Sequence, residues 1–105
     1  MRGGKEEMRV KILTIEGCDY CTWLKSELDA EHIPYIDINA NKEYKLADKM
    51  EMTYKTDRYP MVIVPYKGTN IIILSETSLA TSDTLRTFDT IPHLVGIIKQ
   101  YKNEI

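Results

Sequence analysis

A strand pattern that runs directly into a helix pattern near the start of the chain constrains the fold more than any other feature. Residues 10–15 are apolar and β-branched, and the run ends at Gly17, which marks a turn. A helix pattern follows, with apolar side chains recurring at Cys21, Leu24 and Leu28. Residues 35–38 then form a second strand pattern. Two strands joined through a helix are expected to pair in parallel through a right-handed crossover.

A second helix is predicted between this second strand and the Tyr59-Pro60 pair. Asn39 or Asn41 is the expected cap, because asparagine side chains accept hydrogen bonds from the first turn of a helix. The helix should end before Pro60, since a residue that precedes proline is biased out of the helical conformation. Its buried stripe is predicted to contain Leu46, Ala47 and Met50.

A hairpin and a final helix complete the predicted order. Residues 61–64 and 71–74 are the strongest strand patterns, and the turn residues between them indicate an antiparallel pair. Residues 76–87, rich in Ser and Thr, are expected to form a loop. Asp89 or Thr90 should cap the last helix, whose buried stripe is Ile91, Leu94, Val95, Ile98 and Tyr101. The predicted fold is α/β, in the order β-α-β-α-β-β-α, with a mixed four-stranded sheet flanked by helices.

Length and charge limit the classes of protein to which the chain can belong. Its 105 residues correspond to one domain, expected at residues 9–105 after a flexible leader at residues 1–8. The formal net charge of −2 gives no basic excess to attract nucleic acid or an anionic membrane. Apolar runs reach about four residues, whereas a membrane span needs about 20, and no signal peptide pattern is seen. We therefore expect a monomeric, cytoplasmic protein that binds neither nucleic acid nor membrane.

The two cysteines stand where the first strand gives way to the first helix. At a helix N-terminus, free backbone N–H groups and the helix dipole favour a negative charge on Cys18. Free cysteine has a pKa near 8.5, and sites of this kind lower it to roughly 3.5–7.5, although Asp19 opposes the shift here. Cys21 lies one turn further along the helix. We therefore predict that Cys18 attacks a disulfide and that Cys21 resolves the mixed disulfide.

The cysteine pair has two other interpretations. A zinc site needs two further ligands, and His32 and His93 are not spaced as in a zinc finger, so no metal is expected. The pair could also consist of two core cysteines at helical spacing, without a chemical role.

Tyr59-Pro60, immediately before a strand, is the second chemical feature. We predict a cis bond here, which would turn the Tyr59 backbone toward Cys18 to pair with an incoming peptide-like disulfide. The alternative is an edge proline that merely lacks a donor. Arg58 either binds a carboxylate or stabilises a thiolate, or it is a solvated loop residue.

Together these elements resemble a glutaredoxin, within the thioredoxin-like superfamily, over roughly residues 10–101. Tyr20, just before the second cysteine, resembles glutaredoxins more than thioredoxins, which usually carry Gly-Pro between the cysteines. The resemblance implies a thioredoxin-like fold and glutathione-dependent reduction of protein disulfides or glutathionylated thiols. Ribonucleotide reductase is a common client of the family. Compact divergent members occur in phages, and such a protein would work in the host cytoplasm.

The resemblance also implies roles for individual residues. Cys18 matches the nucleophile and Cys21 the resolving thiol, Tyr20 matches a wall of the active site, and Tyr59-Pro60 matches the peptide-binding segment. The predicted glutathione site consists of Tyr20, Arg58, Tyr59 and Pro60, together with Asp89, which would meet the ammonium group of glutathione.

Three positions depart from the family pattern. Ile15 stands where a lysine is common, Arg58 where a threonine is usual, and residues 76–87 replace a Gly-Gly turn that helps hold glutathione. A thioredoxin-type reductant regenerated by a flavin reductase is therefore an alternative. A second alternative is an iron–sulfur carrier, in which Cys18 and glutathione bridge two chains, and a third is an interaction protein with idle cysteines.

Overall fold

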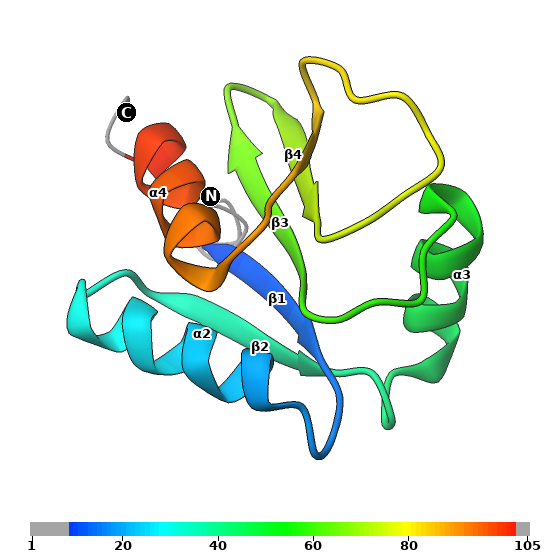
Figure 1. Cartoon of the computed structure of the whole chain (residues 1–105), viewed down its shortest axis with the longest axis horizontal. Helices are drawn as coiled ribbons and strands as arrows, with labels where there is room; N and C mark the ends of the chain where they lie inside the picture. Colours follow the sequence, from blue (N-terminus) through cyan, green and yellow to red (C-terminus); the bar gives the residue numbers. More distant parts are fainter. Residues whose placement is uncertain (1–8, 103–105) are drawn as a thin grey trace.

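A five-stranded mixed sheet forms the middle layer of the protein, in the order β2-β1-β3-β4-β5 (Figure 1). The computed structural model describes residues 9–102, so the leader expected at residues 1–8 lies outside the described residues. The strands are β1 (Val10–Thr14), β2 (Tyr35–Asn39), β3 (Met61–Tyr66), β4 (Thr69–Leu74) and β5 (Leu85–Thr87). The helices are α2 (Asp19–Ala30), α3 (Tyr44–Tyr54) and α4 (Ile91–Lys102).

The strand pairing confirms the predicted parallel pair and the predicted hairpin. β1 and β2 are parallel, while β3 is antiparallel to both β1 and β4. The prediction of four strands was wrong, because β5 adds to β4 in parallel within the segment expected to be a loop. β5 has only three residues, and Leu85 alone points into the core, so no alternating pattern was present to be recognised.

The core lies on both faces of the sheet. α2 and α4 cover one face and α3 covers the other, as Figure 1 shows. Among residues 9–102, the larger cluster contains fourteen buried residues, which include Leu24 and Leu28 of α2 and the whole predicted stripe of α4. The smaller cluster contains six, of which α3 contributes Met50. Among residues 9–102, no helix is both long and apolar enough to cross a membrane.

The helix starts agree only in part with the predicted caps. The Thr90 hydroxyl accepts the His93 N–H at 3.2 Å, so Thr90 caps α4 as predicted. Neither asparagine caps α3, which begins after Glu43 without a side-chain cap. The reason is an intervening turn, in which the Asn39 carbonyl accepts the Glu43 N–H at 2.8 Å. Asn41 instead accepts the Glu16 N–H at 3.1 Å, which ties this turn to the segment before α2.

Candidate active site

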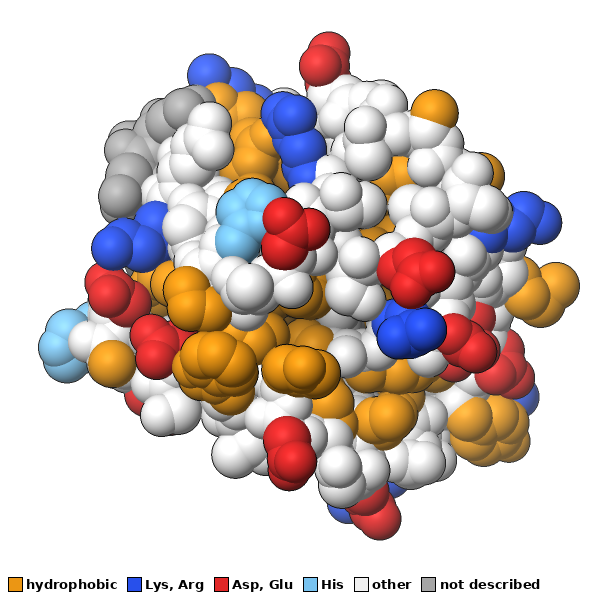
Figure 2. All heavy atoms as spheres, in the orientation of Figure 1, with side chains coloured by type: hydrophobic (Ala, Val, Ile, Leu, Met, Phe, Trp, Pro, Cys, Tyr) orange, Lys and Arg blue, Asp and Glu red, His pale blue; other side chains and the backbone are white. Residues whose placement is uncertain are grey.

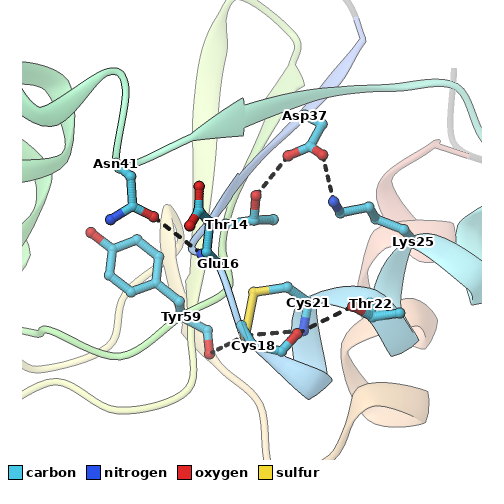
Figure 3. The surroundings of a disulfide bond; sticks show 9 residues. All are labelled: Thr14, Glu16, Cys18, Cys21, Thr22, Lys25, Asp37, Asn41 and Tyr59. Carbon is cyan, nitrogen blue, oxygen red and sulfur yellow. Dashed lines mark hydrogen bonds and ion pairs between the residues drawn. A yellow bond between two sulfur atoms is a disulfide. The ribbon is translucent and has the colours of Figure 1, made fainter.

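Cys18 and Cys21 form a disulfide at the start of α2, with Cα atoms 5.3 Å apart (Figure 3). Cys18 is the N-cap of the helix, and its Sγ accepts the Cys21 N–H at 3.1 Å. Its side chain is partly exposed, whereas Cys21 is 2% exposed and belongs to the buried stripe of α2. The two cysteines therefore differ in exposure, and solvent reaches Cys18 more easily.

The Tyr59-Pro60 bond is cis, as predicted, and it faces the disulfide. The Tyr59 carbonyl oxygen lies 4.0 Å from Cys18 Sγ. The Tyr59 hydroxyl donates a hydrogen bond to Glu51 Oε2 on α3 at 2.6 Å. Burial raises the pKa of Tyr59, and the hydrogen bond to the Glu51 carboxylate raises it further, so the hydroxyl stays protonated as a donor. Helix α3 thus helps to fix the segment that approaches Cys18.

A groove of about 320 Å³ lies beside this segment, and we call it the Pro60 groove. It gathers residues from the start of α2, the segment before β3, the end of β4 and the start of α4. All five residues predicted to bind glutathione line it, namely Tyr20, Arg58, Tyr59, Pro60 and Asp89. The other lining residues are Ser75, Glu76, Phe88, Thr90 and Ile91.

The cysteines line a second recess of about 260 Å³, which we call the Cys18 hollow. It lies between the start of α2 and the carboxyl ends of β1 and β2. Tyr20 and Tyr59 line the Pro60 groove, while Cys18, close to the Tyr59 carbonyl, lines the hollow. The disulfide therefore stands between two recesses, and Cys18 is accessible from the boundary between them.

Arg58 lies in the Pro60 groove, but acidic side chains already contact its guanidinium. Its Nη2 is 3.6 Å from Glu76 Oε1 and its Nε is 3.9 Å from Asp57 Oδ1. The Asp89 side chain is 95% exposed, and its carboxylate lies 4.0 Å from His93 Nδ1. A carboxylate that entered the groove would have to compete with Glu76 for Arg58. Glu76 was not predicted as a site residue, because only the tertiary fold brings it close to Arg58.

A polar network forms one wall of the Cys18 hollow (Figure 3). The Thr14 hydroxyl donates to Asp37 Oδ1 at 2.7 Å, and Lys25 Nζ is 2.6 Å from Asp37 Oδ2. Thr14 is the one buried polar side chain among the residues that the structure describes. Thr14 and Asp37 were not among the predicted site residues. Polar residues near the ends of two adjacent parallel strands were the available signal, because such ends meet at one sheet edge.

The Asp37 network predicts a pH effect on stability. Burial raises the pKa of Asp37, but hydrogen bonds from Lys25 and Thr14, with the Lys25 charge, outweigh burial and keep the pKa below its ordinary 3.8. Because the folded pKa is the lower one, Asp37 stabilises the fold above pH 3.8, and this contribution is lost as the pH falls further. In urea unfolding between pH 2.5 and 6, Asp37→Asn should therefore flatten the fall of the unfolding free energy at acid pH. The exposed control Asp83→Asn should keep the wild-type slope, and equal slopes for both variants would contradict this role.

Comparisons with known proteins do not assign the chain to a family. No protein-family model matches it, and no curated protein is significantly similar in sequence. Among residues 9–102, no group of three or more His, Cys, Asp or Glu side chains is placed to hold a metal ion.

Proposed function

We propose that the protein is a glutaredoxin-type thiol–disulfide oxidoreductase with a thioredoxin-like fold. The observation that carries the proposal is the cysteine pair at the start of α2, with its partly exposed sulfur 4.0 Å from the carbonyl before cis-Pro60. The order of elements and the mixed parallel and antiparallel sheet support the proposed fold. The open Pro60 groove beside the disulfide leaves room for a peptide-like substrate.

The proposed reaction proceeds in two exchanges. The Cys18 thiolate attacks one sulfur of a client disulfide, a Cys18–client disulfide forms, and the first client thiolate leaves. Cys21 then loses its proton and attacks Cys18 Sγ, and the second client thiolate leaves. The client gains two electrons, and the protein is left with the Cys18–Cys21 disulfide that the structure contains. Two glutathione thiols would restore the dithiol and become glutathione disulfide.

A thioredoxin-type reductant is the second candidate, and one contact favours it. Glu76 engages Arg58, the residue expected to bind a glutathione carboxylate. A flavin reductase would then regenerate the dithiol in place of glutathione. Turnover with glutathione, glutathione reductase and NADPH, compared with turnover with thioredoxin reductase and NADPH, separates the two reductants.

The pKa of the Cys18 thiol tests the proposed function directly. We expect it to lie below the 8.5 of a free cysteine, because the Cys21 backbone N–H at the helix start donates a hydrogen bond to the sulfur. The rate of alkylation by iodoacetamide against pH, measured on the reduced Cys21→Ser variant, gives this pKa for Cys18 alone. A value of about 8.5 or higher would favour an idle or structural thiol and contradict the proposal.

A further inference from the structure

Acidic side chains predominate around the disulfide. In the Pro60 groove, the charged lining residues are Arg58, Glu76 and Asp89. In the Cys18 hollow, one lysine, Lys25, stands against three carboxylates. These carboxylates are Glu16, Asp19 and Asp37. Each recess therefore carries a negative formal charge on its own.

Both cations of the two recesses are already engaged by acids. Arg58 contacts Glu76 at 3.6 Å, and Lys25 contacts Asp37 at 2.6 Å. The remaining carboxylates of the two recesses, on Glu16, Asp19 and Asp89, are exposed, and none has a Lys or Arg within 4.0 Å among residues 9–102. The whole chain has a net charge of only −2, so negative charge is concentrated at this edge of the protein. Such a field attracts cationic segments and repels anionic ones.

An exposed aromatic pair adds a second surface that suits cations. Tyr20 and Trp23 on α2 are 62% and 43% exposed. Their rings stack with centroids 6.5 Å apart and an interplanar angle of 23°. Figure 2 shows hydrophobic side chains gathered over the α2 part of this face, with acidic side chains spaced singly around them. Aromatic faces bind ammonium and guanidinium groups, and they also cover the aliphatic stems of Lys and Arg.

We propose that this site selects client disulfides flanked by Lys or Arg and discriminates against disulfides flanked by Asp or Glu. The inference rests on the proposed function and names its substrate class. A basic side chain beside the client cysteine would meet the carboxylates of either recess or the Tyr20–Trp23 pair while the client sulfur reaches Cys18.

A series of peptide disulfides tests the selection. The peptides carry the same cystine and differ only in flanking residues, which are Lys, Gln or Glu. Each peptide is mixed with the pre-reduced protein in a single-turnover experiment. The rate at which the protein is oxidised is followed through the fluorescence of Trp23, the only tryptophan of the chain. No regenerating enzyme is needed, because the protein itself supplies the two electrons. The rate should fall in the order Lys, Gln, Glu, and at low ionic strength the Lys peptide should react about tenfold faster than the Glu peptide. In 0.5 M NaCl the difference in rate between the Lys and Glu peptides should become smaller, because salt screens exposed charges.

A paired variant removes one carboxylate from each recess. Glu16→Gln/Glu76→Gln should reduce the Lys-to-Glu rate ratio at least threefold, because each recess loses one negative charge. Asp83→Asn, an exposed position outside both recesses, is the matched control and should keep the wild-type ratio.

The outcomes separate the two proposals. If no peptide oxidises the reduced protein, the proposed function is wrong. If all three peptides react at one rate at low and high salt, the selection is wrong while disulfide exchange stands. A reversed order, with the Glu peptide fastest, would mean that Arg58 governs recognition, and it would also overturn the selection.

Discussion

Cys18→Ser should lower the rate of disulfide reduction to the uncatalysed background, a loss of more than about 10³-fold. A hydroxyl at this position cannot form the mixed disulfide on which both exchange steps depend. The measurement is reduction of a peptide disulfide with glutathione and glutathione reductase. Because Cys18 is partly exposed at the N-cap of α2, the variant should fold, and far-UV circular dichroism checks this.

Cys21→Ser is the matched control, since it makes the same replacement of sulfur by oxygen one helical turn away. It should lose the reduction of protein disulfides but retain removal of glutathione from a glutathionylated thiol, which needs only Cys18. Mixed with a peptide disulfide, it should accumulate a covalent adduct through Cys18 that mass spectrometry detects. Equal and mild losses in both serine variants would contradict the assigned roles.

Leu24→Ala should destabilise the fold by about 2–5 kcal/mol, the largest stability effect that we predict for a single substitution. Leu24 is fully buried, and it packs α2 into the cluster that also holds the stripe of α4. Truncation leaves a cavity and removes apolar contacts. A domain of this size has a total stability of only about 5–15 kcal/mol, so the loss is a large fraction. The unfolding free energy from urea titration gives the value.

Met52→Ala is the control for this core prediction. Met52 lies on α3 and is 74% exposed, so its truncation should change the unfolding free energy by less than about 0.5 kcal/mol. Similar losses in the two variants would mean that burial in the α2–α4 cluster does not decide stability here.

Local sequence patterns were sufficient to predict most of the fold. The apolar spacing of α2 and α4 predicted their buried stripes, because a helix repeats over several turns within one segment. β5 was missed because its three residues are held by contacts with β4 that no local pattern contains. The predicted cap of α3 was wrong for a related reason. Asn41 had a competing partner, the backbone of Glu16, that lies far from it in sequence.

The candidate site was predictable where chemistry depends on neighbours in sequence. The order of strand, turn and helix placed Cys18 at a helix start. A proline directly before a strand, in a chain with this cysteine pair, indicated the cis bond. Pairings that depend on the tertiary fold could not be predicted. The contact of Arg58 with Glu76 and the Thr14–Asp37–Lys25 network each join segments at least eleven residues apart.

The unequal division of the core gives the two faces of the sheet different resistance to local unfolding. Among the residues that the structure describes, six buried ones lie on the α3 side and fourteen on the other, so release of α3 exposes less apolar surface. α3 also carries Glu51, which holds Tyr59 and thereby the carbonyl beside Cys18. A transient detachment of α3 would thus loosen the wall around the reactive sulfur while the cooperative unit that contains both cysteines stays intact.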